Sequence, residues 1–125
     1  MPTVLDASAV IAFLHDEPGA SAVRASLDEP EIPLLSTVNL TEVAQHVGRD
    51  RPAVIDGLAG LVTIVDYDRG QAQFAARLHA ETREAGLGLA DRACLALAAT
   101  TGSPALTADR AWSRLDVGVE IVQIR

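Results

Sequence analysis

Apolar residues along the chain gather in short runs that alternate with longer stretches of helical spacing. The short runs predict five strands, over residues 3–5, 32–35, 63–65, 104–107 and 119–124. The longer stretches predict helices over residues 8–14, 20–27, 52–61, 69–85 and 89–100, with one or two helical turns over 109–115. Short apolar strands that alternate with helices are typical of a parallel sheet covered on both faces. We therefore expect an α/β fold, a three-layer α/β/α sandwich with a central, mainly parallel sheet.

Individual residues mark where several elements begin or end. Ser36 and Thr37 are candidate N-caps for a further helix that runs to about Val47. Gly86 suits the end of the helix over 69–85, where a left-handed residue is common. Pro33 cannot donate to a strand ladder, so we expect the second strand to be irregular or near an edge of the sheet.

The composition bounds the class of protein. A chain of 125 residues has the usual size of one domain, so we expect a single domain over residues 1–125. Hydrophobic residues make up 49% of the chain and charged residues 22%, a balance typical of globular proteins rather than disordered ones. The formal net charge of −7 argues against a protein that coats nucleic acid without specificity.

Several catalytic classes are excluded by residues that the sequence lacks. All ten basic residues are arginine, which excludes P-loop, Schiff-base and kinase-type lysines. The single cysteine, Cys94, excludes a disulfide framework and a cysteine-based zinc site. The three histidines do not have metal-motif spacing. No basic segment of a signal peptide opens the chain, and no apolar run approaches the roughly 20 residues of a membrane span, so we expect a cytoplasmic protein without membrane contact.

Two aspartates stand where predicted strands end. Asp6 follows the first strand, and Asp109 lies just past the fourth. If those strands are neighbours, both carboxylates open onto the edge of the sheet where α/β proteins bind ligands. Each aspartate could instead cap the following helix, and for Asp109 taken singly capping is the favoured interpretation. Capping explains Asp6 less well, because Ser8 is an alternative cap.

Two further acids lie inside predicted helices. Asp91 shares a helical face with three apolar residues, Cys94, Leu95 and Ala98. A carboxylate on an apolar face needs a partner, and the helix N-terminus, an arginine or a metal ion would each supply one. Glu42 borders an apolar stripe, although a lone helical glutamate is usually a solvated charge.

The four acids would acquire a common role if the fold gathered them. Without lysine and without a cysteine or histidine ligand set, such a cluster favours hard cations with oxygen ligands, Mg²⁺ or Mn²⁺. Without a cation the acids would repel one another and raise their own pKa values. With one or two cations the cluster suits phosphoryl chemistry, in which metal activates water.

Four short segments of the chain together resemble the motifs of a known protein family. They are Val4–Ala9 (VLDASA), Thr41–Val43 (TEV), Leu89–Asp91 (LAD) and Leu106–Arg110 (LTADR). In this order and at these separations, the chain resembles the PIN-domain family over essentially its whole length, and within it the VapC-type toxins of bacterial toxin–antitoxin pairs. The resemblance implies a PIN-like sandwich and a metal-dependent endoribonuclease with Mg²⁺ or Mn²⁺ in an acidic pocket.

The resemblance also implies roles for particular residues. The catalytic acids would be Asp6, Glu42, Asp91 and Asp109, with Asp6, Asp91 and Asp109 on the metal. Glu42 would orient or deprotonate the attacking water, or help to hold a second metal. Ser8 and Thr107 match polar residues that support the acids.

Two arginines next to proposed ligands, Arg92 and Arg110, are candidate phosphate contacts, because a guanidinium binds phosphate with two parallel hydrogen bonds. Surface ion pairs with neighbouring acids explain both arginines equally well. Aromatic residues are 3% of the chain, so base stacking is not the main expected mode of RNA binding.

Partners follow from the same resemblance. It implies a small VapB-type antitoxin that inserts a basic residue into the acidic pocket, a homodimer, and an RNA substrate for which tRNA and rRNA are the candidates. The alternatives are a non-toxin PIN-like nuclease and an RNA- or protein-binding module whose acids are structural. A haloacid-dehalogenase-like phosphatase or a response-regulator receiver also has an aspartate after its first strand, but each relies on a lysine.

Overall fold

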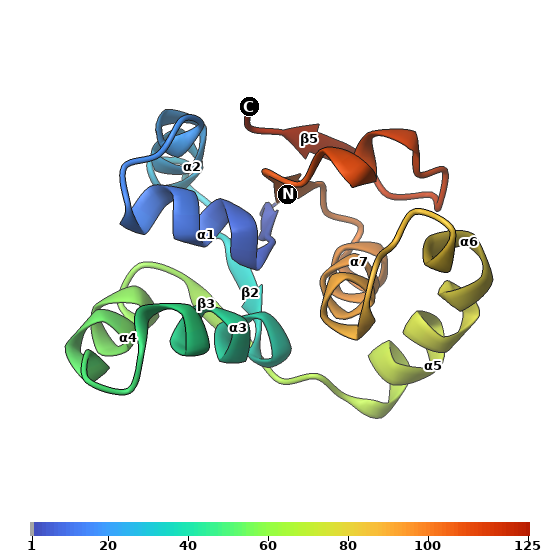
Figure 1. Ribbon diagram of the computed structural model, residues 1–125, viewed down its shortest axis with the longest axis horizontal. Helices are drawn as coiled ribbons and strands as arrows, with labels where there is room; N and C mark the ends of the chain where they lie inside the picture. Colours follow the sequence, from blue (N-terminus) through green and yellow to red (C-terminus); the bar gives the residue numbers. More distant parts are fainter. Residues whose placement is uncertain (1) are drawn as a thin grey trace.

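In the computed structural model, which describes residues 2–125, five strands form one sheet in the order β3-β2-β1-β4-β5, and all neighbouring strands run parallel (Figure 1). The strands are β1 (Val4–Leu5), β2 (Leu34–Ser36), β3 (Thr63–Val65), β4 (Ala105–Thr107) and β5 (Ile121–Gln123). The helices are α1 (Ala7–Leu14), α2 (Ala20–Leu27), α3 (Thr37–Val47), α4 (Pro52–Ala59), α5 (Arg69–Arg77), α6 (His79–Arg83) and α7 (Leu89–Thr101), with a 3-10 helix, η1 (Arg110–Arg114). The expected α/β class with a central parallel sheet is confirmed.

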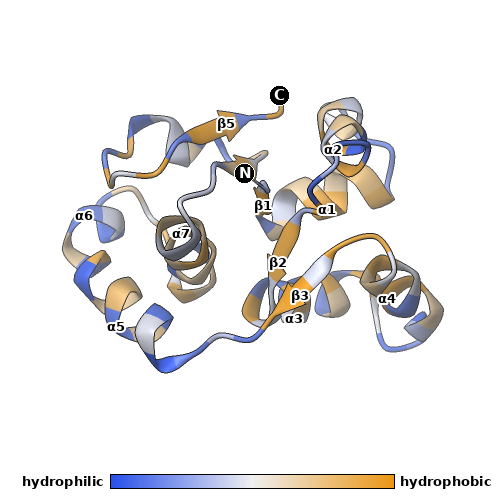
Figure 2. Ribbon diagram, turned by 180° about the vertical axis from the view of Figure 1, so that it is seen from behind, coloured by the Kyte–Doolittle hydropathy of each residue, from blue (hydrophilic) through white to orange (hydrophobic). Residues whose placement is uncertain are grey.

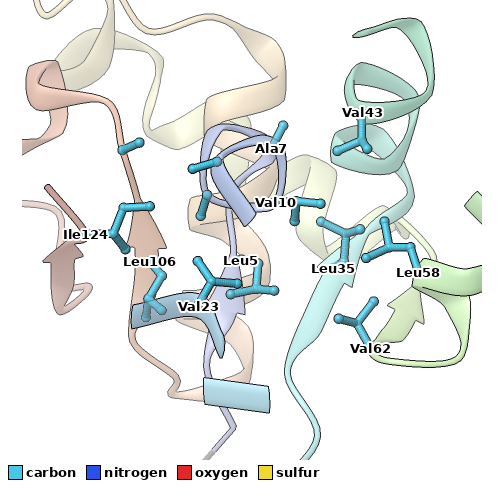
Figure 3. Close-up of a cluster of buried hydrophobic side chains, with 13 residues drawn as sticks. Leu5, Ala7, Val10, Val23, Leu35, Val43, Leu58, Val62, Leu106 and Ile124 are labelled. Carbon is cyan, nitrogen blue, oxygen red and sulfur yellow. The ribbon is translucent and has the colours of Figure 1, made fainter. Parts of the chain in front are cut away.

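Alternating residues of the strands fill two cores, one on each face of the sheet. Leu5 and Leu106, which pair across β1 and β4, face the same core as Val10 of α1 (Figure 3). The preceding pair, Val4 and Ala105, faces the opposite core with residues of α7. Figure 2 shows that the strands β2, β3 and β5 are mostly hydrophobic, with β2 and β3 at the centre of the view and β5 at its upper edge. This two-sided burial follows from the period of two in a strand and explains why the strands read as continuous apolar runs.

The connections bring several chain segments to the carboxyl edge of the sheet. Helix α1 begins directly after β1, and α3 begins directly after β2, where Ser36 Oγ accepts the Val38 N–H at 3.2 Å. Helix α7 leads into β4, so its first turn lies at the same edge as the ends of the strands. Because the chain builds β2 and β3 on one side of β1 and β4 and β5 on the other, the strand order reverses beside β1. This is the place where α/β sheets bind ligands.

The second strand differs from the expectation at Pro33. Strand β2 lies second from the edge of the sheet, as one of the two expected alternatives allows, and pairs in consecutive register with β3, so the expected irregularity is not found. It begins at Leu34, one residue after the proline, and the missing N–H therefore removes no bond from the ladder. The Pro33 carbonyl oxygen still accepts the Thr63 N–H at 2.8 Å.

The helix expected over residues 69–85 is divided in two. At Leu78 the backbone N–H is shared between the carbonyl oxygens of Phe74 (3.3 Å) and Ala75 (3.1 Å), which tightens the turn between α5 and α6. Apolar periodicity did not reveal the break, because Ala75, Leu78 and Thr82 remain buried on one side. Within residues 2–125, no helix is long and apolar enough to cross a membrane.

Candidate functional site

A pocket of about 510 Å³ opens at the carboxyl edge of the sheet. The four acids predicted to gather there all line it: Asp6, Glu42, Asp91 and Asp109. Its remaining lining residues are Ala7, Ser8, Ile11, Gln45 and His46. Because β1 and β4 are paired neighbours, the acids that follow them open onto the same edge, as the sequence predicted.

Asp6 is the most deeply placed of these acids. Its exposed fraction is 3%, and it occupies the N-cap position of α1 without accepting a capping bond. Its Oδ2 instead accepts hydrogen bonds from Ser8 Oγ (2.6 Å) and Thr107 Oγ1 (2.9 Å). The capping interpretation therefore does not account for Asp6, whose carboxylate is held by two hydroxyl groups.

The same two hydroxyls fix the loop that follows β4. Ser8 Oγ accepts the N–H of Ala108 at 2.9 Å, and Thr107 Oγ1 accepts the N–H of Asp109 at 3.0 Å. Since each hydroxyl accepts a backbone proton, its own proton is directed to Asp6. The first acid and the segment that carries the last acid are thus joined through Ser8 and Thr107.

Asp109 is exposed and has two roles in the structure. Its Oδ1 accepts the Ala111 N–H at 2.9 Å, so it caps η1 as the simpler interpretation predicted. It also lines the pocket with the other acids. The capping bond accordingly fixes one oxygen of a carboxyl group that also lines the pocket.

Asp91 stands in the first turn of α7 and is half-buried. Its Oδ2 accepts the Gly88 N–H at 2.9 Å, so the helix N-terminus supplies one partner. No ion pair between an arginine and Asp91 is found among residues 2–125, but the charge of Arg92 lowers the pKa of Asp91 against the rise caused by burial. Asp91 is more buried than Asp109, as expected from its position on the face of α7 that carries Cys94.

Glu42 is not a freely solvated helical charge. It is half-buried, and its Oε2 accepts a hydrogen bond from Asn39 Nδ2 at 3.1 Å. Asn39 is wholly buried and was not singled out from the sequence. The available signal was its spacing, because a polar residue three positions before a glutamate lies on the same helical face.

Two other lining residues were also missed. Gln45 and His46 follow Glu42 on α3, and His46 lies at the i+4 position, on the same side of the helix. The His46 ring stands edge-on to the ring of His15, with 5.0 Å between centroids. These side chains form a polar wall beside the acids on the α3 side.

Burial and mutual repulsion disfavour charge on three of the acids. Burial raises the pKa of Asp6 from its ordinary 3.8 to about 6; the Ser8 and Thr107 hydrogen bonds oppose this rise, while the charges of Asp91 and Glu42 add to it. Burial is also the main cause that raises the pKa of Glu42 and of Asp91, and a neighbouring acid adds to each. The charge of one acid therefore affects the pKa of another, and the acids form one electrostatic cluster.

The chemistry of this cluster fits a hard cation. Carboxylate oxygens are the ligands that Mg²⁺ and Mn²⁺ prefer, and the lining residues include no arginine that would neutralise them. Within residues 2–125, however, no group of three or more histidine, cysteine, aspartate or glutamate side chains is already arranged to hold a metal ion. The pocket thus presents oxygen donors of the kind that such a cation prefers.

The two arginines suggested as phosphate contacts do not line the acidic pocket. Arg92 is half-buried, donates to the Leu87 carbonyl oxygen at 3.0 Å, and lines a separate hollow with Tyr67 and His79. Arg110 is exposed and lines a hollow between η1 and α6. Their contact with phosphate stays a prediction.

Comparisons with known proteins agree with this architecture. The PIN domain family model matches residues 3–118. Ribonuclease VapC30 of Mycobacterium tuberculosis is 30% identical over 124 residues, which cover 91% of this chain and 95% of that protein. Ribonuclease VapC of Mycolicibacterium smegmatis is 29% identical over 124 residues, with 91% and 96% covered. The crystal structure of DNA-bound VapBC from Salmonella typhimurium matches with a TM-score of 0.78 at 19% identity, covering 100% of this chain and 99% of that chain, which shows a shared fold.

Proposed function

This chain belongs to the PIN-domain family and is a VapC-type ribonuclease toxin, and we propose that its acidic pocket hydrolyses RNA phosphodiester bonds with Mg²⁺ or Mn²⁺. The observation that carries the proposal is the pocket itself, which collects four acids from four separate segments of the chain. We further propose that the PIN domain comprises residues 1–125 as one unit.

Three of the acids would hold the cation: Asp6, Asp91 and Asp109. When bound, the cation supplies positive charge that offsets the charge of the phosphodiester and favours ionisation of water. Asp6 is suited to a fixed ligand because two hydroxyl groups hold one of its oxygens. Asp109 is the most exposed of these three acids that line the pocket, so we expect it to be the most accessible to substrate.

Glu42 would orient the attacking water and accept its proton. A carboxylate is a stronger base when its pKa is raised toward the working pH, and burial raises the pKa of Glu42. The Asn39 hydrogen bond keeps one oxygen of this carboxyl group in place. Arg92 and Arg110 would contact phosphates of the RNA outside the acidic pocket.

We propose two protein partners. A small antitoxin that places a cationic side chain among the acids would neutralise the same charges that attract the metal ion, so antitoxin and cation would compete. A second copy of the chain would complete a homodimer. A solved structure from Mycobacterium tuberculosis that is 26% identical to this chain, VapBC-5, is a member of the VapBC family of toxin–antitoxin systems, which supports an antitoxin as the first partner to seek.

An RNA cleavage assay with matched variants tests the proposed function. Asp6→Asn retains the size of the side chain but removes its charge. Asp66→Asn is the control, because Asp66 also follows a strand, β3, yet does not line the pocket. We expect wild-type protein and Asp66→Asn to cleave RNA in Mg²⁺ or Mn²⁺, and EDTA or Asp6→Asn to stop cleavage. Full cleavage by folded Asp6→Asn would contradict the proposal.

A further inference from the structure

Asn39 joins helix α3 to helix α7 beside the acidic pocket. Its side chain has an exposed fraction of 0%. Nδ2 donates to Glu42 Oε2 at 3.1 Å and to the Ala90 carbonyl oxygen at 3.0 Å. Ala90 immediately precedes Asp91. One buried amide thus contacts one acid of the pocket directly and the backbone next to a second acid.

The two contacts fix the orientation of the Asn39 amide. Both partners are acceptors, so the NH₂ group must face them, and a flipped amide would place its carbonyl oxygen against two other oxygens. In the present orientation Oδ1 is buried and has no hydrogen-bond partner among the described residues. A buried acceptor without a partner costs stability. Despite this cost in stability, both N–H donors of the Asn39 amide bond to Glu42 and Ala90.

We propose that Asn39 is a positioning residue for the nuclease reaction. By holding Glu42 Oε2, it leaves Oε1, which has no partner among the described residues, to receive the proton of the attacking water. The second contact, to the Ala90 carbonyl oxygen, holds the Asn39 amide in the orientation that keeps its bond to Glu42. This role rests on the proposed function, because it acts through Glu42.

A purely structural role is the competing explanation, because α3 packs against α7 and any buried amide between them supports packing. The chain offers a matched control. Gln71 on α5 has an exposed fraction of 4%, and its Nε2 donates to the Asp66 carbonyl oxygen at 3.0 Å. Its Oε1 is also buried without a partner, yet Gln71 does not line the acidic pocket.

The first experiment compares Asn39→Ala with Gln71→Ala. Urea unfolding of the metal-free proteins measures stability, and RNA cleavage at saturating Mn²⁺ gives kcat and KM. We expect both variants to lose stability. We expect Asn39→Ala to lower kcat about tenfold or more, the scale of a lost hydrogen bond to a charged group, with KM nearly unchanged. Gln71→Ala should keep the wild-type kcat. If Asn39→Ala is not folded, Asn39→Ser, which retains a donor and leaves a smaller void, replaces it.

The second experiment is a double-mutant cycle between positions 39 and 42. If Asn39 acts through Glu42, then Asn39→Ala should change kcat by less than about twofold once Glu42→Ala is present. In the metal-free proteins the two substitutions should also be non-additive in the free energy of unfolding, which reports the contact without catalysis.

The outcomes separate the two ideas. An equal loss of kcat from Asn39→Ala with and without Glu42, or an equal loss from Gln71→Ala, overturns the positioning role alone. A wild-type kcat in Glu42→Ala contradicts the proposed part of Glu42 in the reaction, and the role of Asn39 falls with it.

Discussion

Ser8 Oγ and Thr107 Oγ1 lie 3.2 Å apart although 99 positions separate them in the sequence, and both donate to the same oxygen of Asp6. The two hydrogen bonds occupy Oδ2 of Asp6, and neither hydroxyl donates to Oδ1. The convergence of the two hydroxyls also ties the end of β1 to the end of β4, because each hydroxyl accepts an N–H from the segment after β4. The arrangement places one carboxylate oxygen in a fixed position while the other stays available for a ligand.

Removing the Thr107 hydroxyl should weaken the fold and shift the pH dependence of cleavage. Thr107→Val leaves the Asp109 N–H without an acceptor, which should lower the free energy of unfolding by about 1–3 kcal/mol. The Thr107 hydrogen bond lowers the pKa of Asp6, so its loss should raise that pKa and move the acid limb of the pH–rate profile to higher pH. Urea unfolding and a pH series measure the two effects. Thr107→Ser, which keeps the hydroxyl, should resemble wild type, and an unmoved acid limb in Thr107→Val would contradict the argument.

The metal-free protein should be more stable at pH 5 than at pH 7.5. The folded pKa of Asp6, about 6, lies above its unfolded value of 3.8, so the folded state binds this proton more tightly. The stabilisation is fully present below pH 3.8 and is lost as the pH rises through about 6. The full rise corresponds to about 3 kcal/mol, and about half of it falls between pH 5 and pH 7.5.

Urea unfolding in EDTA at the two pH values measures this slope. Asp6→Asn should reduce it and leave the smaller contributions of Glu42 and Asp91, whose pKa values are raised in the same direction. A slope equal to that of wild type in Asp6→Asn would show that Asp6 does not titrate as described.

Divalent cations should stabilise the native state. Because the cations bind the folded acids and relieve their repulsion, millimolar Mg²⁺ or Mn²⁺ should raise Tm by about 3 °C or more. Thermal melts of wild type, Asp6→Asn and Asp66→Asn measure the shift. Only Asp6→Asn should lose most of it, and melts that are insensitive to both ions in all three proteins would favour structural acids.

Asp91 and Asp109 should differ in what their removal does. Asp91→Asn keeps an acceptor for the Gly88 N–H but removes a repelling charge, so metal-free stability should be unchanged or higher while the Mn²⁺ response falls. Asp109→Ala removes the cap of η1, worth about 1 kcal/mol, and should keep part of the Mn²⁺ response because this acid is exposed. Melts with and without Mn²⁺, beside RNA cleavage, make the comparison. A clear loss of metal-free stability in Asp91→Asn with an intact Mn²⁺ response would place Asp91 outside the metal site.

The local signals in the sequence predicted most elements of the fold. Short apolar runs marked the strands, and the central strands β1 and β4 are buried throughout. Three of the four acids could be named from local position, because two follow strands and one lies on an apolar helical face, while Glu42 was named only through the family resemblance. Pro33 led to the wrong expectation of an irregular strand because β2 begins one residue later, at Leu34. The missing N–H of the proline therefore lies outside the ladder. The break at Leu78 was hidden because both halves of that segment keep the same buried side.

Only the tertiary structure decided which residues far apart in the sequence come into contact. No local pattern connects Asn39 to Ala90, 51 positions away, or Ser8 to Thr107, because these contacts depend on which helices cross and which strands pair. The partners of a buried polar group are set by the packing around it, and so are the pKa values that its burial shifts. Sequence alone thus named the acids, while the pairing of β1 with β4 and the packing of α3 against α7 determined how deeply each one lies and which group holds it.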